Sequence, residues 1–125
     1  DCESGREFLE RVLKDGREDG SGMQICGMFD ITEELLEKPC DTYSSGEKKK
    51  IYLARVLSRR NHVIVLDEPL NYMDVMFRRQ LVEAFRALRP TVLLIEHDDF
   101  FLRNLATVIV DLDTGGTERV LRSPL

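Results

Sequence analysis

Two short apolar runs, each followed at once by polar residues, limit most strongly how this chain can fold. The first run, VIVL, directly precedes Asp67 and Glu68, and the second, VLLI, precedes His97 by one residue. Runs of this kind are typical of buried strands in a parallel sheet. Because parallel strands end at the same edge of a sheet, we expect these polar residues to meet there.

The segment between the two runs predicts a helix from Asp74 to Arg89. Pro90 prevents its continuation. A strand, a helix and a second strand in this order form a right-handed crossover. A third apolar run, TVIV, precedes a Gly-Gly pair and predicts a last strand with a hairpin turn. The fold class is therefore α/β, a parallel sheet with flanking helices. The apolar residues at helical spacing are Phe77, Leu81, Val82, Phe85 and Leu88.

The first part of the chain is predicted to be helical. Thr32 is expected to cap a short helix that Pro39 ends, and a long helix runs from Ser44 to near Arg60. We expect residues 1–60 to form a small helical subdomain with this long helix, and residues 61–125 to belong to an α/β core. Apolar stripes at helical spacing consist of Phe8, Leu9, Val12 and Leu13 in the first helix and of Ile51, Leu53, Ala54 and Leu57 in the long one.

Composition and charge exclude several classes of protein. A net charge of -5 argues against a general nucleic-acid footprint. No apolar stretch reaches the roughly 18 residues that span a bilayer, and no leader pattern opens the chain, so we expect a cytosolic protein without membrane insertion. Three widely spaced cysteines, an odd number, indicate free thiols rather than a zinc site. A local basic run is either a solvated helix face or a local nucleic-acid contact; it consists of Lys48, Lys49, Lys50, Arg55, Arg59 and Arg60.

Adjacent carboxylates after a buried strand are suited to magnesium and water chemistry. Asp67 could hold Mg²⁺ or one of its waters, and Glu68 could orient or deprotonate an attacking water. Two adjacent acids also occur by chance in loops. Pro69, Asn71 and Asp74 follow them and favour the functional interpretation. His97 is either a core histidine or a donor to a phosphate or to the attacking water.

The start of the long helix is suited to phosphate binding. Ser44, Ser45 and Gly46 would present free N–H groups, hydroxyls and the positive end of the helix dipole. A plain serine N-cap is the other interpretation of the same residues. Glu47, in the first turn, compensates the helix dipole in either case.

Three segments together resemble ABC ATPases. VIVLDEPLNYMD resembles the second phosphate-site motif and D-loop of that family, YSSGEKKKIYLARVL its signature motif and helix, and LLIEHD its switch-histidine segment. They occur in the family's order over residues 40–112. The resemblance implies ATP and Mg²⁺ as cofactors, with Glu68 and His97 catalytic and Asp67 holding Mg²⁺ through water. The implied nucleotide-binding residues are Ser44, Ser45, Gly46, Glu47 and Asp74.

The P-loop pattern G-x-x-x-x-G-K-[ST] does not occur in this sequence. The resemblance therefore implies the later half of one cassette, inactive as an ATPase by itself. In the family's sheet the P-loop strand lies between the strand ending near His97 and the strand around Val108. We expect the resulting gap to be closed either by the Val108 strand moving inward or by another copy of the chain, so that the fragment self-associates.

Within the family, DEPLNYMDV and IEHDDFF most resemble the ABC-F branch, soluble tandem ATPases that act on ribosomes. YSSGEKKK and PLNY resemble its antibiotic-resistance members, which dislodge drugs from the large subunit. The implied partners are a second cassette and the ribosome. Two alternatives stay open, the ATPase subunit of a membrane transporter and a non-catalytic docking module. Coiled-coil DNA-repair ATPases also use a related signature, but they normally lack the DEPLNYMD and EHD segments.

Overall fold

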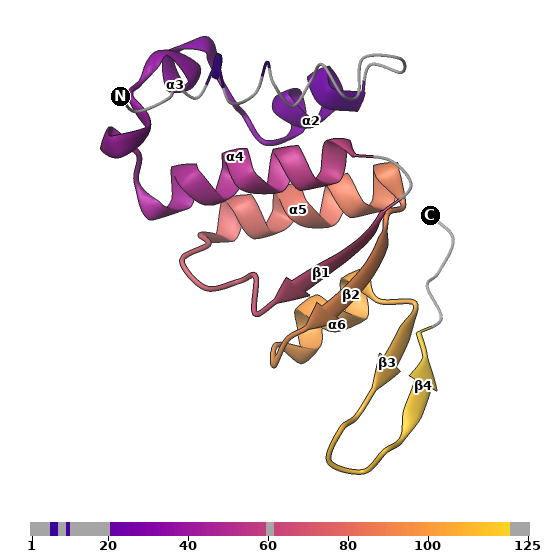
Figure 1. Cartoon of the computed structure of the whole chain (residues 1–125). Coiled ribbons are helices and arrows are strands. Elements are labelled where there is room, and N and C mark those ends of the chain that lie inside the picture. Colours follow the sequence, from indigo (N-terminus) through magenta and orange to yellow (C-terminus); the bar gives the residue numbers. More distant parts are fainter. Residues whose placement is uncertain (1–5, 8–9, 11–20, 60–61, 121–125) are drawn as a thin grey trace.

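The computed structural model describes residues 6–7, 10, 21–59 and 62–120 (Figure 1). The predicted first helix stripe and Arg60 lie outside these residues. The helices are α2 (Ser21–Met28), α3 (Glu33–Glu37), the 3-10 turn η1 (Cys40–Thr42), α4 (Ser45–Ser58), α5 (Val75–Leu88) and α6 (Asp99–Leu105). The strands are β1 (Val63–Asp67), β2 (Thr91–Ile95), β3 (Val108–Val110) and β4 (Thr117–Arg119).

The predicted crossover is confirmed. β1 and β2 pair in parallel, with Val63 opposite Thr91 and Asp67 opposite Ile95, and α5 connects them. The Asp74 side chain caps α5 by accepting a hydrogen bond from the Phe77 N–H at 2.7 Å. Parallel strands joined by a helix agree with the predicted α/β class.

Helix caps set the bounds of the helices that precede β1. Thr32 caps α3 by accepting a hydrogen bond from the Leu35 N–H, as predicted, and α3 ends before Pro39. Ser44 caps α4, whose buried residues include all four of its predicted apolar residues.

One core unites the helices with the sheet. Phe29, which follows α2, and Phe77 of α5 are almost fully buried, and their rings meet edge to face with centroids 5.2 Å apart. Leu53 of α4 and Leu81 of α5 belong to the same cluster, and α4 and α5 lie side by side over the sheet (Figure 1). The cluster crosses the predicted boundary at residue 60, and the division there into two parts stays a prediction.

The two central strands are buried on one face only, which corrects the expectation of fully buried strands. Ile64 and Leu66 are buried under the helices, whereas Val63 and Val65 on the opposite face are 68% and 60% exposed. Leu93 of β2 is 57% exposed on that same face. Side chains alternate along a strand, and one face of β1 contributes Ile64 and Leu66 to the core cluster that the helices also form.

The last two strands form a sheet of their own. β3 pairs antiparallel with β4, with Val108 opposite Arg119, which confirms the predicted hairpin. Within the described part of the chain, β3 does not pair with β2. The inward movement of the Val108 strand, one of the two expected ways to close the gap, is therefore wrong for this structure, in which β3 pairs with β4 in a sheet apart from β1 and β2. Pairing with another copy of the chain stays a prediction.

Candidate functional site

The polar residues after β1 and β2 meet at one edge of the sheet, as the sequence predicts. The Glu68 N–H extends the strand pairing by donating to the Ile95 carbonyl oxygen at 2.8 Å. Glu68 itself has left-handed backbone geometry, with φ at 46°. This geometry is uncommon for a residue with a side chain, and it turns the chain sharply out of β1 directly after Asp67.

Glu68 and His97 contact each other across that edge. Glu68 Oε1 lies 2.8 Å from Nε2 of His97. The His97 side chain is 86% exposed and that of Glu68 is 41% exposed, so His97 is no core histidine and the first of its two interpretations is excluded. A carboxylate beside an accessible imidazole can accept or orient a proton of a water molecule.

Asp67 fits a magnesium ion that is held in part by other ligands. Its carboxylate is exposed at the end of β1. Among the described residues, no group of three or more His, Cys, Asp or Glu side chains could enclose a metal ion. Mg²⁺ is commonly bound by one or two carboxylates together with waters and substrate phosphates, and this single strand-end carboxylate fits that mode.

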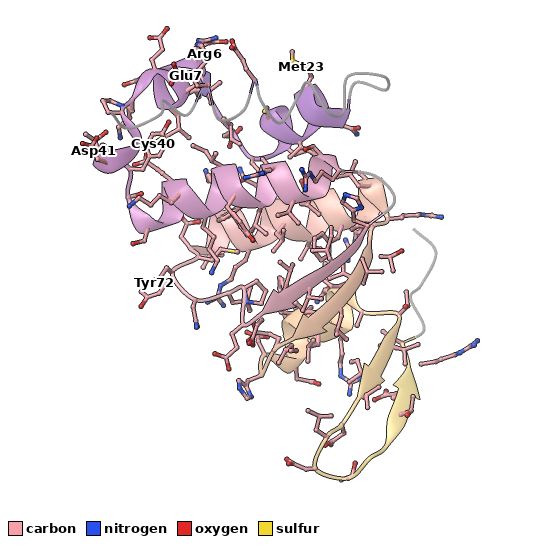
Figure 2. All side chains as sticks on the ribbon, viewed as in Figure 1. Arg6, Glu7, Met23, Cys40, Asp41 and Tyr72 are labelled. Atoms are coloured by element: carbon pink, nitrogen blue, oxygen red, sulfur yellow. The ribbon has the colours of Figure 1, made fainter. Side chains whose placement is uncertain are left out.

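The loop from Glu68 to Asp74 has an exposed tip. Tyr72 also has left-handed geometry, with φ at 62°, and its side chain is 83% exposed and projects from the loop (Figure 2). Asp74 uses one carboxylate oxygen to cap α5. In this structure its side chain therefore positions a helix, and its expected role toward nucleotide stays a prediction.

The start of α4 is a complete capping box. Ser44 Oγ accepts from the Glu47 N–H at 3.1 Å, and Glu47 Oε1 accepts from the Ser44 N–H at 3.3 Å. Lys38 donates to both carboxylate oxygens of Glu47, a contact that sequence reasoning missed because Lys38 belongs to a different local segment. Ser45 is exposed beside this box, and Gly46 faces the loop after β1, since an added Cβ would lie 3.8 Å from the Tyr72 carbonyl oxygen.

The basic run on α4 is only partly a solvated face. Lys48 is exposed, but Lys49 donates to the Asn71 carbonyl oxygen. Lys50 lies over the ring of Phe77, with its nitrogen 5.6 Å from the ring centroid. Lys49 and Lys50 thus contact the loop after β1 and the start of α5, which composition alone does not indicate.

The ion pair of Glu47 makes a prediction about stability and pH. Burial acts to raise the pKa of Glu47, but hydrogen bonds from Lys38 and Ser44 outweigh it and hold that pKa below its ordinary value. A lowered pKa stabilises the fold above the pKa of the unfolded glutamate, about 4.3, and this contribution is lost as the pH falls through the folded pKa. We expect Glu47→Gln to cost roughly 0.5–1 kcal/mol at pH 7 and progressively less below pH 4.

Urea unfolding of the chain at pH 7 and at pH 3.5 measures this effect. Glu34→Gln is the control, because Glu34 is exposed in the first turn of α3. An equal loss of stability for Glu47→Gln at both pH values would show that the charge of Glu47 does not stabilise the start of α4.

Comparison with known proteins identifies the family. The profile of the ABC transporter family matches residues 7–71, more than half of the chain. The chain belongs to the ABC transporter family. Relatives of this ABC chain include ABC transporter F family member 2 of Arabidopsis thaliana, 25% identical over 74% of this chain and 14% of that protein. Elongation factor 3A of Saccharomyces cerevisiae is 33% identical over 68% of this chain and 8% of its own length.

Solved structures of ABC proteins share the fold. The archaeal ribosome recycling factor aABCE1, solved in complex with the ribosomal stalk protein aP1, is matched with a TM-score of 0.73 and 26% identity over 86% of this chain and 20% of that one. An ATP-binding subunit of an ABC transporter is matched with a TM-score of 0.76 at 17% identity, over 94% and 53% of the two chains, which supports the fold alone. Within the part of the chain that the structure describes, no helix is long and apolar enough to cross a membrane.

The chain is short beside its curated relatives, since it spans 8% to 23% of the length of eight of them. Domains of the ABC family generally bind ATP with Mg²⁺ and work with a second cassette. The roles of the individual residues follow below as proposals.

Proposed function

We propose that the chain is the later half of an ATP-hydrolysing cassette in a cytosolic ABC-F protein that acts on the ribosome. The 2.8 Å contact between Glu68 and His97 carries this proposal. It joins two segments separated by a whole helix and a strand, and it lies at the sheet edge where an α/β fold binds its ligand.

In this proposal, Glu68, His97 and Asp67 each have a different role in phosphoryl transfer. Glu68 orients or deprotonates the attacking water, and His97 donates toward the charge that develops in the transition state. Asp67 would hold Mg²⁺ through water, and the bound ion would neutralise charge on the phosphate oxygens. A P-loop from another part of the protein would position the phosphates. Because this sequence contains no P-loop pattern, we propose that the chain alone does not hydrolyse ATP.

The signature segment would serve a second cassette. Ser44, Ser45 and Gly46 stand at the start of α4, where the amide groups and the helix dipole attract a γ-phosphate. Glu47 supports this segment through the capping box, and Asp74 holds the neighbouring loop by capping α5. Two cassettes that close around ATP would then each complete the other's site.

The names of similar proteins support action on the ribosome. They include two ABC transporter F family members, two elongation factors 3 and a ribosome recycling factor bound to a ribosomal stalk protein. The likeness of YSSGEKKK and PLNY to antibiotic-resistance proteins supports a more specific role in drug release. An ATPase subunit of a membrane transporter is the alternative that the experiment below must separate.

Ser45→Arg in the full-length protein tests this proposal. A long cationic side chain at exposed Ser45 would fill the space that a γ-phosphate of the opposing site needs. In the presence of ATP, we expect the parental protein to sediment with ribosomes on sucrose gradients and the variant to lose most of this association. Ala87→Arg is the control, since it places the same side chain on an exposed position of α5.

The outcomes separate the alternatives. Parental protein found with membranes rather than ribosomes would favour the transporter subunit. ATP-dependent ribosome binding that survives Ser45→Arg would argue against closure through the signature segment. Ribosome binding that is the same with and without ATP would favour the non-catalytic docking module.

A further inference from the structure

Lys49 occupies the junction of the three segments that carry the proposed chemistry. It lies on α4, one turn after the capping box, and its ammonium group donates to the Asn71 carbonyl oxygen in the loop after Glu68. That end of α4 and this loop lie on the same side of the molecule (Figure 1). A Cβ added to Gly46 would lie 3.8 Å from the Tyr72 carbonyl oxygen, so the same two segments also lie near each other at that point.

Glu96 connects this junction to the histidine. Its Oε1 accepts a hydrogen bond from the His97 N–H at 2.9 Å, while its Oε2 is buried and has no hydrogen-bond partner among the described residues. A buried carboxylate oxygen without a partner costs free energy unless a charge compensates it. Glu96 lies close enough to act on Lys49: burial lowers the pKa of Lys49, and the charge of Glu96 opposes this lowering without outweighing it.

The lysine therefore faces both halves of the catalytic edge. On one side it donates to the loop that begins at Glu68, and on the other it lies within electrostatic reach of Glu96, whose Oε1 accepts from the His97 N–H. Lys48 and Lys50, its neighbours in sequence, do neither, since Lys48 is exposed and Lys50 lies over the ring of Phe77.

We propose that Lys49 is a positioning residue that couples the signature helix to the Glu68 loop and, through Glu96, to His97. The expected effect of Lys49 on ATP hydrolysis rests on the proposed function. The coupling between α4, the Glu68 loop and His97 does not depend on that function. When α4 moves against a second cassette, Lys49 would carry the displacement to the loop and to the histidine together. Lys49 touches no nucleotide in this proposal and acts through the residues that do.

Lys49→Met in the full-length protein measures the coupling. We expect kcat for ATP hydrolysis to fall roughly 10- to 100-fold, the effect of a small misplacement of reacting groups, with KM for ATP unchanged. Lys49→Arg keeps a charged donor and is expected to retain most of the rate. Lys48→Met is the matched control and should hydrolyse ATP at the parental rate.

A double-mutant cycle with Glu96→Gln tests the path to His97. If Lys49 acts through Glu96, Lys49→Met and Glu96→Gln disturb the same interaction. The fall in kcat of the double variant is then expected to be smaller than the product of the falls in the two single variants. Strictly multiplicative effects would remove Glu96 from the proposal.

A readout without ATP keeps this inference separate from the proposed function. In nuclear magnetic resonance spectra of the chain, Lys49→Met should shift the backbone amide signals of Tyr72 and His97, and Lys48→Met should leave both in place. Unmoved signals in Lys49→Met would overturn the coupling even if the protein is an ATPase. Moved signals in a full-length protein that hydrolyses no ATP would overturn the proposed function and leave the coupling intact.

Discussion

Glu68→Gln is expected to slow ATP hydrolysis by the full-length protein by roughly 10² or more, the usual contribution of a positioned general base. The amide has nearly the same shape as the carboxylate, so ATP should still bind. It cannot accept a proton from water, however, and it changes the 2.8 Å contact with His97 from a charge-assisted pair to a weaker hydrogen bond. Single-turnover hydrolysis of radiolabelled ATP, beside equilibrium binding of ATP, measures the two effects separately.

Glu83→Gln is the control for this variant. Glu83 is exposed on α5 and pairs only loosely with Arg79, at 4.0 Å. Its replacement should leave both hydrolysis and binding unchanged. Parental turnover in Glu68→Gln would remove Glu68 from the chemistry, and a loss of ATP binding in the same variant would indicate a role in holding nucleotide instead.

Phe77→Ala should destabilise the chain by about 3–5 kcal/mol, the cost of emptying a large buried site. Phe77 is 2% exposed at the start of α5, packs edge to face on Phe29, and lies under the ammonium group of Lys50. One truncation therefore removes contacts to the helical part and to α4 at the same time. The loss is large beside a total stability of about 5–15 kcal/mol for a folded domain.

Urea unfolding followed by circular dichroism measures this loss. Met76→Ala is the control, because Met76 precedes Phe77 on the same helix but is 61% exposed, and we expect it to cost less than about 0.5 kcal/mol. Equal midpoints for the two variants would mean that the helical part does not fold onto α5 as the structure has it.

Local signals in the sequence were sufficient for the elements of this fold. Thr32, Ser44 and Asp74 have short polar side chains, and each precedes a helical segment with apolar residues. All three cap the helix that follows. The runs before Asp67 and before Glu96 predicted two parallel strands, and the helix between them left a right-handed crossover as the simplest connection. These features need only neighbours within a few residues.

The meeting of Glu68 with His97 was also predictable, but for a different reason. Parallel strands joined by one helix end at the same edge, so residues that follow them are brought together by topology. The exposure of the His97 side chain could not be predicted, because exposure depends on what covers the edge. In the described part of the chain its side chain is exposed.

What the sequence by itself determined is the order and type of the elements, the caps that bound them and the edge at which the polar residues gather. Only the tertiary structure decided that Lys49 reaches the Asn71 carbonyl oxygen, that Lys38 pairs with Glu47, and that the central strands are covered on one face. Caps and stripes act within one or two helical turns, whereas these contacts depend on how whole helices pack against the sheet. Lys48, Lys49 and Lys50 are equivalent in sequence, but successive residues of a helix point in different directions. The packing of α4 therefore leaves Lys48 exposed, places Lys49 at the Asn71 carbonyl oxygen and places Lys50 over the Phe77 ring.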